Sequence, residues 1–238
     1  QSDTDAYAGR LANARELSRR AADAANRNDQ KKTAALWSLN AALREAEAGN
    51  AAEARVRVTS AMALASTRDL RMVTALTLAR AGDIAHAQTI VDDLSKEAPL
   101  NTVLNGYWLP TLRATIELDR KHADKAVELL RTASTYELGQ SSPINGMYPV
   151  YVRGEAYLKA GEGSKAGGEF QKLLDHRGIV QNFVLGSLAH LQLGRAKAMS
   201  NDKEGARKAY QDFFALWSDA DPHIPILKQA KTEVETLQ

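Results

Sequence analysis

The sequence predicts an all-α protein, a right-handed superhelix of antiparallel helix pairs with about 12 helices. Three observations predict it. A small residue is followed twelve positions later by Ala five times, and a turn signal lies between the two in every copy. A larger apolar side chain follows that Ala at four positions, and another apolar residue follows at seven. The last spacing marks one face of an α-helix. Each copy therefore indicates a helix, a tight turn and a second helix.

The small residue lets the two helices of a pair cross closely, because a larger side chain would hold the backbones apart. At the turn, Gly or Asn can take the left-handed conformation that ends one helix, and a following Asn or Asp can cap the next. The five pairs are Ala42 and Ala54, Ala75 and Ala87, Ala114 and Ala126, Gly154 and Ala166, and Gly194 and Ala206. The turn signals are Gly49-Asn50, Gly82-Asp83, Lys121-His122, Gly161-Glu162 and Asn201-Asp202.

The repeats form a single domain over residues 1–238. Upstream, Ala14, Ser18 and Ala21 repeat the pattern of a second helix, whose first helix would need residues before Gln1. Because the chain also lacks an initiator Met, we expect a piece of a longer polypeptide. The expected units are a partial repeat over 1–30, repeats starting near 35, 68, 107, 147 and 187, and a capping helix over 224–237.

Two glycine-containing stretches stand out between the helices. The stretch from Gly139 to Asn145 contains Ser and Pro and predicts a long loop. Gly161 to Gly168 superficially suggests a phosphate-binding loop, but such a loop follows a strand, and this stretch joins two predicted helices. We therefore interpret it as a turn, with Gly167 and Gly168 as room for close packing.

The composition argues against several classes of function. The 31 basic and 29 acidic side chains are evenly spread and give a net charge of +2, so we expect no nucleic-acid partner. With no Cys and no HxxxH or HExxH among five His residues, we expect no metal and no cofactor. No Gly-x-Ser-x-Gly turn is present, and we predict no enzymatic activity. The longest uncharged run, Gly178 to Gly194, is too short and polar to span a membrane, so we expect a soluble domain of undetermined location.

The spacing of small residue, Ala and aromatic side chain, with Pro99 twelve residues after Ala87, resembles the tetratricopeptide repeat family over nearly the whole chain. Several first helices depart from the family pattern, with Ser38 and Ala41 in place of the expected aromatic and leucine. The resemblance implies a superhelix whose first helices line a concave groove.

A closer resemblance is to the repeat tails of membrane-anchored bacterial serine/threonine protein kinases. It is carried by Tyr107–Pro110, Tyr148–Gly154, Ala209–Phe213 and Asp221–Lys228. The chain contains no glycine-rich strand loop, His-Arg-Asp loop or Asp-Phe-Gly motif. If the parent is a kinase, this chain is a non-catalytic part of it.

The inner face of the first helices holds the candidate binding residues. Large aromatic side chains with a polar atom are typical of the centres of protein interfaces. The alternative is that these residues fill the core between helices. The predicted partner-groove residues are Trp108, Tyr148, Tyr151, Met72, Leu76, Leu191 and Arg195.

The sequence therefore predicts a protein–protein interaction or scaffold domain that binds a partner segment in its concave groove, as the sensor or scaffold region of a bacterial signalling protein. Two alternatives stay open. A structural spacer or homodimerisation element is favoured if the groove aromatics are buried. A small-molecule-sensing domain is favoured if a closed apolar pocket lies near Trp108.

Overall fold

The computed structural model describes residues 1–139, 144 and 146–237, and in these residues all regular structure is helical. Most of the predicted loop from Gly139 to Asn145 lies outside the described residues. The helices are α1 (Ser2–Tyr7), α2 (Leu11–Arg27), α3 (Lys31–Glu47), α4 (Ala51–Leu64), α5 (Arg68–Arg80), α6 (Ile84–Glu97), α7 (Leu109–Asp119), α8 (Ala123–Leu129), α9 (Tyr148–Lys159), α10 (Gly163–Asp175), α11 (Arg177–Val180), α12 (Val184–Met199), α13 (Lys203–Leu216) and α14 (Pro225–Glu235). A π-helical turn, η1 (Leu104–Trp108), leads into α7, and a 3-10 turn, η2 (Thr132–Thr135), follows α8.

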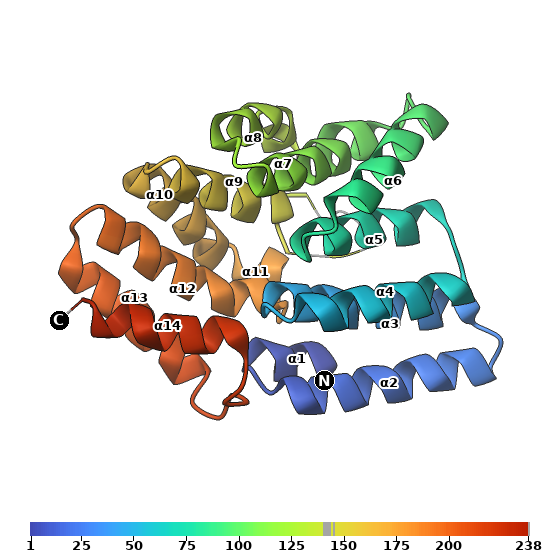
Figure 1. Ribbon diagram of the computed structural model, residues 1–238, viewed down its shortest axis with the longest axis horizontal. Helices are drawn as coiled ribbons and strands as arrows, with labels where there is room; N and C mark the ends of the chain where they lie inside the picture. Colours follow the sequence, from blue (N-terminus) through green and yellow to red (C-terminus); the bar gives the residue numbers. More distant parts are fainter. Residues whose placement is uncertain (140–143, 145, 238) are drawn as a thin grey trace.

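The helices pack in sequential pairs, α3 with α4, α5 with α6, α7 with α8, α9 with α10 and α12 with α13 (Figure 1). This confirms the helix–turn–helix units that the twelve-residue spacing predicts. Every small residue and every Ala of that spacing is buried. The short helix α1, which the sequence analysis did not anticipate, packs against α2.

Two glycines show why the small residue is required at the crossing point. A Cβ at Gly154 would lie 2.7 Å from the ring of Phe170, and a Cβ at Gly194 would lie 2.8 Å from the ring of Tyr210. In both pairs the space is filled by an aromatic side chain of the second helix. The pairs thus bury an aromatic ring directly against the backbone of the first helix.

The five predicted turns all adopt the left-handed backbone conformation, at Gly49, Gly82, Lys121, Gly161 and Asn201. The predicted capping by the next residue holds in two of them. Asp83 accepts from the backbone N–H of His86, and Asp202 accepts from that of Gly205. At the remaining turns no capping hydrogen bond forms.

The interpretation of Gly167 and Gly168 as room for close packing is wrong. A Cβ at Gly167 would make ordinary contacts at 3.8 Å or more, and one at Gly168 would meet open space. The close approach in this region is instead at Gly163, where a Cβ would lie 2.7 Å from the carbonyl oxygen of Ala196.

The array of pairs bends back until the C-terminal segment meets the N-terminal helices (Figure 1). Trp217 Nε1 donates to the carbonyl of Tyr7 at 3.0 Å, and the Asp221 N–H donates to the carbonyl of Gly9 at 3.0 Å. The Asp221 carboxylate accepts from the N–H of Ala12 at 2.7 Å and so caps the start of α2. The segment that follows α13 is therefore hydrogen-bonded to the segment between α1 and α2.

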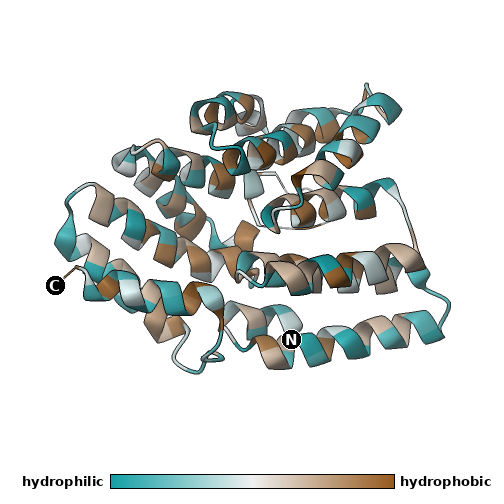
Figure 2. Cartoon of the chain, viewed as in Figure 1, coloured by the Kyte–Doolittle hydropathy of each residue, from teal (hydrophilic) through white to brown (hydrophobic). Residues whose placement is uncertain are grey.

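The first helices of successive pairs contact one another, and α12 also contacts α1 and α3. Their inner side chains meet in one large hydrophobic cluster that runs through all the pairs. Figure 2 shows hydrophobic and hydrophilic positions alternating along the helices, as expected where one face of each helix is buried. Among the described helices, none is both long enough and apolar enough to cross a membrane.

We predict opposite effects of two Gly-to-Ala substitutions. Gly168→Ala should stabilise the protein by about 0.5–1 kcal/mol, because it removes backbone entropy in a helix and meets no neighbour. Gly154→Ala should cost about 1–3 kcal/mol, because its methyl group would overlap the Phe170 ring. Chemical denaturation measures both, and equal tolerance of the two substitutions would contradict the close crossing.

A second prediction concerns the contact between the chain ends. Asp221→Ala should destabilise by about 1 kcal/mol, the usual cost of losing a helix cap, and should speed hydrogen exchange at Ala12. The matched control is Asp219→Ala, which removes an exposed carboxylate two residues away. Unchanged exchange at Ala12 in the Asp221 variant would show that α2 does not depend on this cap.

Candidate functional site

The structure buries six of the seven predicted groove residues. The three aromatic side chains have no exposed surface, and Arg195, whose side chain is 19% exposed, is engaged in an ion pair. Because the ends of the array meet, the first helices converge and their inner faces pack on one another rather than on a partner. The six buried residues are Met72, Leu76, Trp108, Tyr148, Tyr151 and Leu191.

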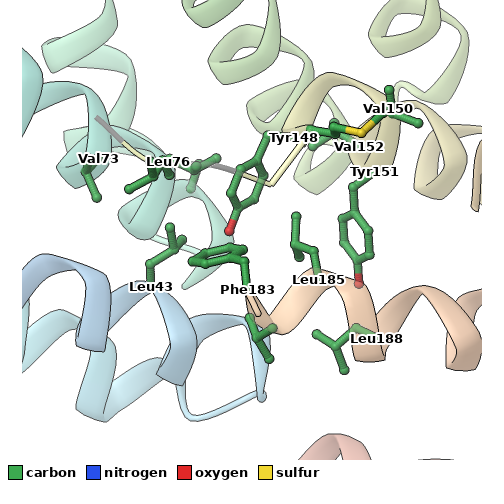
Figure 3. Packing of buried hydrophobic residues seen from close by; sticks show 14 of the residues in the cluster. Leu43, Val73, Leu76, Tyr148, Val150, Tyr151, Val152, Phe183, Leu185 and Leu188 are labelled. Carbon is green, nitrogen blue, oxygen red and sulfur yellow. The ribbon is translucent and has the colours of Figure 1, made fainter. Parts of the chain in front are cut away.

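The aromatic side chains are held by edge-on ring contacts. The ring centroid of Tyr148 lies 5.9 Å from that of Phe183, and the centroid of Tyr151 lies 5.8 Å from that of Phe170. Figure 3 shows Tyr148 and Tyr151 pointing from α9 toward Phe183 and Leu188, on the opposite side of the core. Tyr148 and Tyr151 therefore fill the core between helices, which was the alternative interpretation of their sequence pattern.

A buried ionic cluster lies within this aromatic core. Arg80 from α5 donates to the Glu47 carboxylate of α3 at 2.7 Å and to Glu155 of α9 at 2.9 Å. The hydroxyl of Tyr148 donates to Glu47 at 3.2 Å. The Arg80 guanidinium also lies 5.6 Å from the ring centroid of Tyr151. The cluster joins α3 and α5, from adjacent helix pairs, to α9, and the Glu47 side chain has no exposed surface while those of Arg80 and Glu155 are mostly buried.

Burial and charge act in opposite directions on these groups. Removal from water raises the pKa of Glu47, and the positive charge of Arg80 offsets only part of that effect. Burial opposes the charge of Arg80, but the carboxylates of Glu155 and Glu47 outweigh it and raise the pKa of Arg80. Burial and the neighbouring Glu47 raise the pKa of Tyr148. The single guanidinium of Arg80 is shared between the two carboxylates of Glu47 and Glu155.

The polar contacts continue toward the C-terminal helix. Gln192 of α12 donates to the Tyr151 hydroxyl at 3.1 Å and accepts from Arg195 at 3.2 Å. Arg195 makes two 2.9 Å hydrogen bonds to Glu233 of α14, which also accepts from Tyr210 at 3.0 Å. Arg195, predicted to contact a partner, instead fixes the last helix to the array.

Sequence reasoning missed Glu47 and Arg80. Both stand five residues after the small residue of their repeat, so they occupy equivalent positions in adjacent repeats and carry opposite charges. Opposite charges at equivalent positions of adjacent repeats are a signal that the sequence contains. In the structure α3 and α5 pack together, and the two side chains form an ion pair.

Two of the surface openings differ clearly in character. The first is a polar cavity of about 310 Å³ lined by Asp3 and Thr4, by Asn40 of α3, and by the connection between α11 and α12. The second is a wider apolar groove of about 750 Å³ between the end of α13 and α14, lined by Phe214, Trp217, Leu227 and Val234 among others. Neither contains the predicted groove aromatics.

No family model, no curated protein and no solved structure matches this chain. Within the described residues, no group of three or more His, Asp or Glu side chains is placed to hold a metal ion. The Gly161–Gly168 stretch forms the turn between α9 and α10 and the first half of α10.

The buried cluster predicts a specific dependence of stability on pH. Because the pKa of Glu47 is raised in the folded state, the stability that Glu47 contributes is fully present below its ordinary value of 4.5 and is lost as pH rises through the raised value. Glu47→Gln should remove this decline, whose limiting slope is about 1.4 kcal/mol per pH unit. Denaturant unfolding from pH 4 upward measures it.

The control for this experiment is Glu128→Gln, which changes an exposed carboxylate on α8. Its unfolding free energy should follow that of the wild type at every pH. A Glu47→Gln profile parallel to the wild-type profile would show that Glu47 is not held by burial in the way described.

Proposed function

We propose that this protein is a non-catalytic interaction domain, in which a rigid helix array presents a surface to a partner polypeptide. The observation that carries the proposal is the apolar groove between α13 and α14. Large apolar openings rimmed by charged residues are typical of sites for protein partners. Here Lys231 and Glu235 form the charged rim.

The shape of this groove suits an amphipathic helix of the partner. Leu227, Lys231 and Val234 are spaced four and three residues apart, so they lie on one face of α14. Phe214 near the end of α13 and Trp217, the residue that follows this helix, line the other side of the groove. A third helix laid between two helical faces would continue the helix-on-helix packing of the rest of the molecule.

The inner face does not serve as the partner groove in this proposal, because its aromatic residues are buried. That burial of Trp108, Tyr148 and Tyr151 favours a second candidate, a structural spacer or homodimerisation element. The two proposals differ in whether the α13–α14 groove is occupied by another protein.

We further infer that the pairs form one tight turn of a right-handed superhelix of the tetratricopeptide type. The resemblance to repeat tails of bacterial serine/threonine kinases supports a role as the sensor or scaffold region of a signalling protein. Two of the segments that carry this resemblance lie in the core or at the contact between the C-terminal and N-terminal parts of the chain. Tyr148–Gly154 lies on α9 in the core, and Asp221–Lys228 reaches from the contact with α2 into α14.

We predict that Val234→Glu weakens partner binding. A carboxylate in the groove would have to be desolvated against apolar side chains, so affinity for a helical partner segment should fall at least about tenfold. A photo-reactive group at Lys231 should cross-link the partner in cells, and the cross-linked segment, made as a synthetic peptide, provides the binding assay.

Two controls make the test specific. Val56→Glu introduces the same charge at a position that is 63% exposed on α4 and should bind as the wild type does. A photo-reactive group at Lys96 of α6 should not capture the same segment. Cross-linking that does not distinguish Lys231 from Lys96, or a peptide that binds the Val234 variant normally, would contradict the proposal.

A further inference from the structure

A small cavity lies where the N-terminal helix α1 meets the segment around α11. Its volume is about 270 Å³, and its lining comes from α1, the end of α10, α11 and the first turn of α12. Helix α1 contacts α12, and α11 contacts both α10 and α12, so packed helices form the walls. A 3.1 Å hydrogen bond from Asn182 Nδ2 to the Thr4 hydroxyl joins the two sides, which are 178 residues apart in the sequence.

Most of the side chains around this cavity are apolar. Leu173, Leu174 and Val180 supply aliphatic groups to the lining. The ring of Tyr7 packs against the backbone of α12, where a Cβ at Gly186 would lie 2.8 Å from it. Leu173 and Val180 also belong to the hydrophobic core, so this wall is held in place. Cavities of this kind bind the apolar part of a small ligand and orient it with a few polar groups.

Two polar groups of the lining are left without a partner inside the protein. Among the described residues, no hydrogen bond or ion pair reaches the Arg177 guanidinium or the Tyr7 hydroxyl. Burial raises the pKa of Tyr7, and the positive charge of Arg177 offsets part of that effect, so the two groups are close enough to interact. Of the lining residues, Arg177 alone carries a charged side chain.

The charge of Arg177 is not neutralised by the carboxylates of the adjoining cleft. Arg177 also lines that cleft, which lies between α10, α12 and α13 and contains Asp175 and Asp212. Asp175 accepts a hydrogen bond from Gln171 at 2.9 Å, and Asp212 lies 3.4 Å from Lys208. Because neither carboxylate pairs with Arg177, the N–H groups of its guanidinium are available to a ligand.

We propose that this cavity binds a small aliphatic carboxylate. The carboxylate accepts hydrogen bonds from the Arg177 guanidinium and the Tyr7 hydroxyl, and the aliphatic chain lies against the apolar side chains of the lining. An amine would meet the positive charge of Arg177 with no carboxylate in the lining to offset it. The cavity shares no residue with the α13–α14 groove, so the proposal does not depend on the proposed function.

Calorimetric titration of the intact protein at pH 7 tests the site. The probe is 4-methylpentanoate, with 4-methylpentanamide as a neutral analogue of the same shape and 3-methylbutylamine as the cationic control. The acid should bind at least about tenfold more tightly than the amide, because only the acid forms a charge-assisted pair with Arg177, and the amine should not bind.

A further probe, N-acetyl-leucine, distinguishes a free acid from the C-terminus of a polypeptide. It carries its carboxylate and aliphatic chain on a peptide unit. The free acid should bind more tightly, because the cavity of about 270 Å³ is small. Tighter binding of N-acetyl-leucine would instead assign the cavity to a polypeptide C-terminus.

Substitutions of the two polar groups give the decisive comparison. Arg177→Gln should weaken binding of 4-methylpentanoate at least about tenfold and leave the amide unaffected. Its melting temperature should equal that of the wild type, since Arg177 is exposed. Tyr7→Phe keeps the ring and should weaken the acid by about three- to tenfold through loss of one hydrogen bond. The matched control is Arg131→Gln, at an exposed arginine before η2, and it should bind as the wild type does.

NMR spectra locate the binding independently of the affinities. The Nε–H resonance of Arg177 should shift when the acid is added and should stay in place when the amine is added. The proposal fails if the acid does not bind at millimolar concentration, or if the amide and the amine bind as tightly as the acid. It also fails if Arg177→Gln keeps the wild-type affinity or the Arg177 resonance does not move, because any binding would then lie elsewhere.

Discussion

The close crossing of two helices within each pair is the constraint on which the rest of this structure depends. The first helix provides a small residue, and the second places Ala opposite it with a larger side chain one turn further on. At Gly154 and Gly194 that side chain is an aromatic ring pressed against the backbone. Each pair is therefore thin at the crossing point, and neighbouring pairs can pack closely enough to bend the array.

The bend brings the C-terminal segment against the N-terminal helices. The inner face of the first helices is therefore buried rather than exposed to solvent. In an open array the inner positions of the first helices would face solvent. Here α12 reaches α1 and α3, and these positions pack on each other. The polar groups among them must then find partners within the protein, and Glu47, Arg80 and Glu155 do so.

Because the inner face is filled by side chains, the polar cavity and the apolar groove lie elsewhere on the surface. The apolar groove lies beside the last helix, and the polar cavity lies where α1 meets the α11–α12 connection. Both are formed by segments from distant parts of the sequence or by the loops that follow the regular repeats.

The sequence alone determined the helical class, the pairing and the turns, because these depend on contacts within about 20 residues. The left-handed turn residues and the buried small residues follow directly from local spacing. The surroundings of Trp108, Tyr148 and Tyr151 could not be predicted in this way. An apolar inner position gives the same pattern in a groove and in a core, and only the contact between α12 and α3, far apart in sequence, separates the two. The same long-range closure decided that Asp221 caps α2 and that Arg195 binds Glu233, since neither interaction has a local signal.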